Sequence, residues 1–149
     1  MKSLFNTEVH AEILSRINQL SESTQRQWGK MEVGQMLHHC QFPLKVALGK
    51  LTIKKPNPFM KLIYSGFKKS MYSDKLWKHN LPTAPGFVVT EPKEFVQEKE
   101  KLVNLVNDFY GEREKEVWGR HPAFGDLTNE QWGQMQYKHL DHHLRQFGV

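Results

Sequence analysis

Apolar residues recur at intervals of three and four along this chain, and this spacing limits the possible folds more than any other sequence feature. Such spacing places apolar side chains on one face of an α-helix. It occurs in residues 7–20, 31–51, 92–113 and 128–147, while no segment alternates strictly enough to indicate a strand. We therefore predict an all-α fold, an antiparallel four-helix bundle in a single domain that spans residues 1–149.

A long, proline-containing connection separates the second and third of these helices. Its amphipathic piece around residues 59–71 predicts one short helix between two irregular arms. A connection of this length in a compact domain is usually functional or covers something. We therefore expect a bundle with a long decorated crossover between helices two and three.

Local signals predict where several helices begin or bend. Thr7 is a candidate N-cap of the first helix, and Thr128 with Gln131 predicts a capping box at the start of the last. Pro92 suits the first turn of the third long helix, where a missing amide hydrogen has no consequence. Pro43 lies inside the second helix and removes a main-chain hydrogen bond, so we expect a kink there.

The composition excludes two broad classes of protein. Of the 149 residues, 38% are hydrophobic and 25% are charged, too apolar for a disordered chain and too polar for a membrane protein. Glu8, Glu12 and Arg16 interrupt the apolar residues near the start, so no signal peptide is expected. Cys40 is the single cysteine and cannot form an intramolecular disulfide. These features favour a cytoplasmic location.

Positive charge is concentrated in the crossover. Residues 50–79 contain eight lysines against one acid, Asp74, whereas the whole chain has a net charge of +5. Because the excess is local, nucleic-acid binding is not favoured. We favour the solvated face of a helix whose apolar side packs on the bundle. Three other uses stay open: contact with a phosphate backbone, contact with an anionic lipid surface, and attraction of an anionic substrate. The interleaved residues are Lys54, Lys55, Phe59, Ile63, Tyr64, Phe67, Lys68 and Lys69.

Five of the eight histidines form two clusters on predicted helices. His139 and His143 are four residues apart on the last helix, the spacing that helical zinc sites use. His142 is expected to point away from the apolar face, toward solvent. The second helix offers His38 or His39 as a third ligand, and its neighbours favour His39 only slightly, so this choice stays open.

Several neighbouring residues have two interpretations. Gln35 is a candidate hydrogen-bond partner of a metal-ligating His39, and Gln136 either orients a ligand or is a plain surface amide. Cys40 lies on the apolar stripe, so we interpret it as a small core residue. Asp141 is expected to be solvated, and no acidic residue is spaced to act as a general base for the cluster.

Residues 121–125, HPAFG, form a distinctive loop before the last helix. We favour a structural role, in which Pro122 and Gly125 shape the turn, Phe124 packs and His121 caps it. The alternative places His121 at the mouth of the histidine site. Trp118, Trp132 and Tyr137 are expected in the core.

Three motifs carry a family resemblance: WGKMEVGQMLHHC, HPAFGDLTNEQW and YKHLDHHLRQFG. Together they resemble the DinB/YfiT-like superfamily of metalloenzymes, in a branch known as a domain of unknown function. The resemblance implies a four-helix bundle that holds a divalent metal ion, typically nickel or zinc. The residues that match the implied ligands are His39, His139 and His143.

The resemblance also sets functional expectations. It implies a metal-dependent enzyme that catalyses thiol-dependent transfer or hydrolysis of a small molecule. It does not indicate catalytic residues other than the metal ligands. A thiol cofactor and a homodimer are further expectations. The alternative is a non-enzymatic binding module that uses the lysine-rich surface of residues 50–79, with a structural metal or none.

Overall fold

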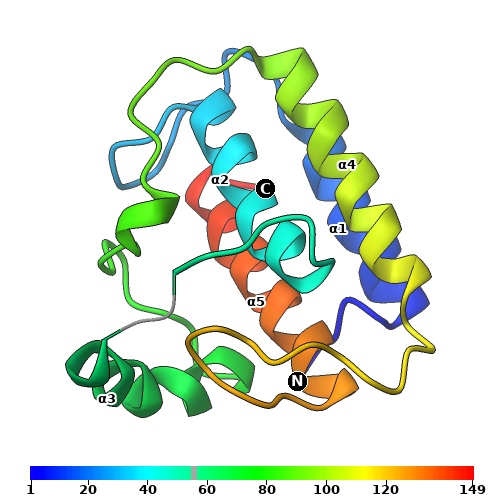
Figure 1. Ribbon diagram of the computed structural model, residues 1–149. Coiled ribbons are helices and arrows are strands. Elements are labelled where there is room, and N and C mark those ends of the chain that lie inside the picture. Colours follow the sequence, from blue (N-terminus) through cyan, green and yellow to red (C-terminus); the bar gives the residue numbers. More distant parts are fainter. Residues whose placement is uncertain (55–56) are drawn as a thin grey trace.

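Helices dominate the part of the chain that the computed structural model describes, residues 1–54 and 57–149 (Figure 1). These residues contain no β-strand, only an isolated bridge between His121 and Gly125. The all-α prediction is therefore confirmed. The helices are α1 (Thr7–Gln19), α2 (Val33–Ala47), α3 (Pro58–Lys68), α4 (Phe95–Gly111) and α5 (Asn129–Gln146), with two short 3-10 helices, η1 (Lys69–Tyr72) and η2 (Pro85–Phe87).

Four of these helices share a hydrophobic core. α2 packs against α4 and α5, and α1 packs against the same two helices (Figure 1). Each contributes a stripe of apolar residues at helical spacing, which is why the periodicity located these helices. The fully buried members with the largest side chains include Trp132, Phe109, Ile13, Ile17, Met36, Leu37, Leu44, Leu102, Leu140 and Leu144.

The helix starts differ from the predictions at two of three places. Asn6, not Thr7, caps α1, because the Asn6 side chain accepts hydrogen bonds from the amides of residues 8 and 9. Pro92 precedes α4, which begins at Phe95 behind a Glu94 cap, so a first-turn position for the proline is wrong. The capping box at the start of α5 is confirmed, with Thr128 as its cap. Pro43 lies inside α2, and a kink there stays a prediction.

The connection between α2 and α4 runs along one side of the molecule (Figure 1). Within it, α3 lies at the lower left of the view and packs mainly on η1, while η1 packs on α5. The loop after η1 is held by buried Lys138 of α5, which donates to the carbonyl oxygen of Lys75 at 2.6 Å and to that of Ser73. Residues after α3 are thereby fixed against the helix that carries two of the clustered histidines.

The HPAFG loop has the structural role that we favoured. His121 Nδ1 accepts hydrogen bonds from the amides of Ala123 and Phe124, both at 3.1 Å. Gly125 has φ +73°, a backbone conformation that other residues rarely adopt. Phe124 packs against the core cluster. Burial, reinforced by nearby Lys68, lowers the pKa of His121 to about 4.

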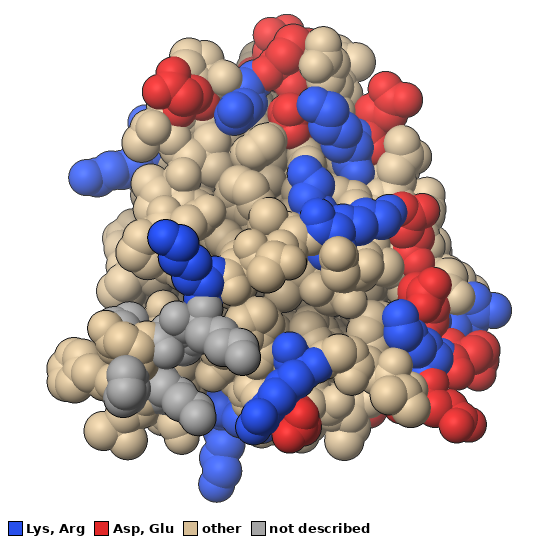
Figure 2. All heavy atoms as spheres, in the orientation of Figure 1, with Lys and Arg blue, Asp and Glu red and all other residues tan. Residues whose placement is uncertain are grey.

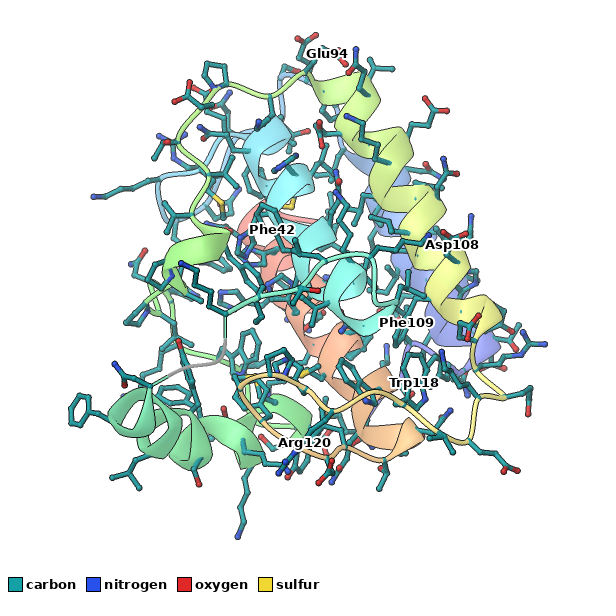
Figure 3. The ribbon with its side chains drawn as sticks, in the orientation of Figure 1. Phe42, Glu94, Asp108, Phe109, Trp118 and Arg120 are labelled. Atoms are coloured by element: carbon teal, nitrogen blue, oxygen red, sulfur yellow. The ribbon has the colours of Figure 1, made fainter. Side chains whose placement is uncertain are left out.

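Of the three aromatic residues expected in the core, Trp132 is buried, whereas Trp118 and Tyr137 are half-buried against it. Figure 3 shows Trp118 in the loop after α4, where its ring lies 5.4 Å from that of Phe109. None of the described helices has the length and apolar character that a membrane span requires.

Candidate metal centre

The fold brings His39 of α2 together with His139 and His143 of α5. One ring nitrogen from each lies within 4.8 Å of the others, and this group can hold a metal ion. The Nε2 atoms of His39 and His139 are 3.1 Å apart, and the His143 ring lies 4.7 Å from each of the other two rings. The structure thus brings together the three histidines that the resemblance indicated.

Hydrogen bonds fix the protonated nitrogen on two of these rings. The Nδ1–H group of His39 donates to the carbonyl oxygen of Phe87 at 2.9 Å. The Nδ1–H group of His143 donates to Oε1 of Gln146 at 2.8 Å, while Nε2 of that amide donates to the Trp28 carbonyl, also at 2.8 Å. Because both carbonyls only accept, these bonds set the tautomers and leave Nε2 of each ring as a lone-pair donor.

The third histidine has unmet hydrogen-bonding capacity. Nδ1 of His139 is buried and has no hydrogen-bond partner among the residues that the structure describes. Its Nε2 faces the lone pair of His39 Nε2, a contact that without a cation needs a proton on one of the two atoms. Buried polar groups normally have partners, so the unpaired Nδ1 of His139 is an exception within the cluster.

The three rings are neutral at pH 7. Burial lowers the pKa of all three, to about 3 for His143, and well below the usual value for His139. Each ring would also repel a charge on its neighbours, which lowers the pKa values of His139 and His143 further. Neutral imidazole is the form that binds metal ions.

His38, the alternative to His39, contacts a different partner. Its Nδ1 lies 2.8 Å from Oε2 of Glu98 on α4, and the same oxygen accepts from Gln41 at 2.6 Å. Lys101 pairs with the other carboxylate oxygen at 3.0 Å. The sequence analysis did not single out Glu98. Its position, four residues before Leu102 and seven before Leu105, places this acid on the apolar side of the helix and could have indicated its burial.

His142 is not solvated as predicted. Its ring lies 5.9 Å from that of Trp28 and 5.5 Å from that of Trp77, and these residues line a small cavity of about 50 Å³. The expectation failed because the crossover covers this side of α5. Trp77 also lies 6.3 Å from His139, so the crossover supplies one wall of the histidine cluster.

Two phenylalanines line the opposite side of the cluster. The Phe42 and Phe87 rings stack at 5.2 Å, and both lie edge-on to His39 at 6.3 and 6.4 Å. Phe42 comes from α2, and Figure 3 shows it on the side of that helix nearest η2. Aromatic side chains therefore lie beside His39 and His139.

Two predictions about glutamines are wrong, because each side chain donates to a main-chain carbonyl oxygen that the helical pattern does not reveal. Gln35 does not contact His39, because its Oε1 accepts from the Glu32 amide and its Nε2 donates to the Thr90 carbonyl. Gln136 is buried, and its Nε2 donates to the carbonyl oxygen of Pro43. It therefore links α5 to α2 rather than acting as a surface amide.

The prediction that Asp141 is solvated is wrong. It is 6% exposed and pairs with Arg16 of α1 at 2.8 Å and with Arg145 at 2.9 Å. A buried carboxylate is stable only when it is paired, and Arg16 reaches it because α1 packs on this side of α5. The core assignment of Cys40 is confirmed, since its thiol is buried and burial raises its pKa.

Comparison with known proteins gives one match. A family model described as a protein of unknown function (DUF1569) matches residues 2–148. No curated protein and no solved structure matches the chain.

Proposed function

This chain belongs to the family of proteins of unknown function DUF1569, and we propose that it binds a divalent metal ion through His39, His139 and His143. The fold we propose for it is a single-domain, DinB-like four-helix bundle made of α1, α2, α4 and α5. Bundle interiors commonly hold metal ions between side chains of facing helices.

One observation carries this proposal: two rings direct unprotonated Nε2 atoms toward a common centre. Phe87 and Gln146 hold the Nδ1–H groups of His39 and His143, an arrangement typical of metal-ligating histidines. The 3.1 Å separation of His39 Nε2 and His139 Nε2 fits the same interpretation, because a cation at the centre of the cluster would accept the lone pairs of both atoms. The residues present therefore fit a metal ion.

The donor set fits the nickel or zinc ion that the family resemblance implies. Imidazole nitrogen suits both ions, and no carboxylate or thiolate joins the cluster within the described ranges 1–54 and 57–149. With three neutral ligands, such an ion supplies an uncompensated positive charge and open positions for water, a thiol or another small molecule. The chain itself orients His39 through the Phe87 carbonyl and orients His143 through Gln146, and Phe42, Phe87 and Trp77 lie beside these rings.

The reaction class that we propose is transfer or hydrolysis of a small molecule, with a thiol as co-substrate. A three-histidine arrangement is typical of catalytic rather than structural sites, and the thiol follows from the family resemblance alone. The buried Cys40 thiol is not the co-substrate, because it contacts the Met36 sulfur inside the core at 3.6 Å. The thiol must therefore come from solution.

Metal content measured by elemental analysis tests the site directly. Protein purified without chelators is expected to contain close to one nickel or zinc ion per chain, and the His39→Ala, His139→Ala and His143→Ala variants are expected to lose it. His38→Ala and His142→Ala are matched controls, because each removes the neighbouring histidine of a doublet and should keep the ion.

Two results would change the conclusion. Wild-type protein that takes up no metal after incubation with nickel and zinc salts would refute the site. Bound metal whose removal lowers the melting temperature, with no thiol transfer or hydrolysis detected in a substrate screen, would instead indicate a structural ion.

A further inference from the structure

The short helix α3 presents its apolar side to solvent. Phe59 and Leu62, which are three residues apart and share one side of α3, are 71% and 73% exposed. Phe67 lies nearer the side of Tyr64 and is 41% exposed. On the side that meets the protein, the Tyr64 ring lies 6.1 Å from that of Phe124, and Lys68 donates to the carbonyl oxygen of residue 126 at 2.9 Å. The expectation that the apolar side packs on the bundle is therefore wrong for these residues. Lys55 and the side chain of Ile63 lie outside the described residues.

Unpaired positive charge accompanies this apolar side. Lys54, Lys69, Lys75 and Lys78 are exposed, and none of them forms an ion pair with a residue that the structure describes. Asp74, the single acid of residues 50–79, lies 3.6 Å from the N-terminal amino group. In Figure 2 acidic side chains lie along the right edge, at the top and at the lower centre, and none is visible at the lower left, where Figure 1 places α3.

We propose that α3 docks in the plane of an anionic lipid surface. Phe59 and Leu62 would enter the boundary between headgroups and acyl chains, and the exposed lysines would contact the anionic headgroups. A helix with one apolar side and flanking cations binds membranes in this way, because burial of apolar area and attraction to anionic lipid act together. The chain then associates with a membrane without spanning it.

Charge argues against two other occupants of this surface. A second copy of the chain would form a symmetric contact that places identical lysine-rich surfaces against each other. A nucleic acid would offer phosphates to the lysines, but its backbone would not bury Phe59 and Leu62. An anionic membrane offers an acceptor for both kinds of side chain.

Vesicle co-sedimentation with the full chain tests the proposal. We expect binding to vesicles of phosphatidylcholine with 30% phosphatidylserine, and weaker binding to pure phosphatidylcholine. The double variant Phe59→Ser/Leu62→Ser should reduce partitioning by at least about tenfold, since burial of two large apolar side chains is lost. Lys54→Gln/Lys69→Gln should lower binding to the anionic vesicles and reduce its dependence on salt.

Matched variants on other surfaces control for nonspecific effects. Val96→Ser/Val117→Ser removes two apolar side chains that are 64% and 81% exposed elsewhere, and should bind within about twofold of wild type. Lys30→Gln is the equivalent control for charge, since Lys30 is exposed outside the crossover. Circular dichroism verifies that all variants keep their helical content.

Three results would overturn the proposal. The first is wild-type protein that does not sediment with anionic vesicles. The second is vesicle binding that survives Phe59→Ser/Leu62→Ser, because this would leave a purely electrostatic contact. The third is self-association in sedimentation velocity that the same double variant abolishes, which would assign the surface to a second copy of the chain.

Discussion

Replacement of Gly29 by alanine tests whether the loop before α2 orients a histidine. Gly29 has φ +83°, and a Cβ atom there would lie 2.3 Å from Nε2 of Gln146. That nitrogen donates to the Trp28 carbonyl, while Oε1 of the same amide accepts from His143. Alanine at this position must displace the Gln146 amide, so we expect both a less stable fold and a less well oriented His143 ring.

The size of the effect follows from two contributions. A left-handed backbone costs an alanine about 1–2 kcal/mol. Displacement of Gln146 leaves buried polar groups unpaired, which costs about 1–3 kcal/mol more. Gly29→Ala should therefore lower the free energy of unfolding by about 2–5 kcal/mol. It should also weaken metal binding at least about tenfold, as loss of a histidine's hydrogen-bond partner typically does.

Gly49→Ala is the matched control. Gly49 has φ +69°, and a Cβ atom there meets nothing within 4 Å, so this variant has the backbone strain without the collision. We would compare the two by urea unfolding of metal-free protein, followed by circular dichroism, and by metal competition against a chromophoric chelator. Equal losses of stability in the two variants would refute the role of the collision. Unchanged metal affinity in Gly29→Ala would refute the link to His143.

Two further predictions concern the pH dependence of stability. Burial alone would raise the pKa of Glu98, but hydrogen bonds from Lys101, His38 and Gln41 outweigh it and lower the pKa to about 2. The carboxylate should therefore contribute up to about 3 kcal/mol that is present above pH 4.5 and lost as the pH falls toward 2, and Glu98→Gln should remove this slope from urea unfolding measured across that range. The pKa of His121 is lowered to about 4 in the folded protein, so as the pH falls below 6.5 the unfolded chain binds a proton at this residue before the folded chain does. Stability should fall by up to about 3 kcal/mol between pH 6.5 and 4, and a wild-type slope that persists unchanged in His121→Asn would contradict this assignment.

The helices could be predicted because each buries one apolar stripe. Val9, Ile13 and Ile17 of α1 are all buried, as their spacing of four requires. The same geometry placed His139 and His143 on one side of α5, independently of any partner. The choice of His39 over His38 came mainly from the family resemblance, since periodicity placed both histidines off the centre of the stripe.

Predictions failed where a partner from another segment decides the environment. Asp141 lies off the apolar face of α5, and its burial is made favourable by Arg145 on the same helix together with Arg16 of α1, whose approach the sequence does not show. His142 is covered by Trp28 and Trp77, which belong to loops without periodic sequence. The prediction for α3 failed in the same way. An amphipathic pattern indicates that a helix has an apolar and a polar side, but it does not indicate which side contacts the rest of the protein.

The fold depends mainly on patterns within each helix, whereas the candidate metal site depends on partners from other segments. The four packed helices bury their own stripes. The carbonyl that binds His39 belongs to residue 87 in a 3-10 turn, and the one that holds the Gln146 amide, the partner of His143, belongs to residue 28 in a loop. These main-chain groups have no side-chain signature, so the sequence can indicate the three candidate ligands without showing how they are held. Substitutions that displace either segment should therefore leave the helical content intact while they weaken the site. This is the reason to measure unfolding and metal affinity separately in the Gly29 variant.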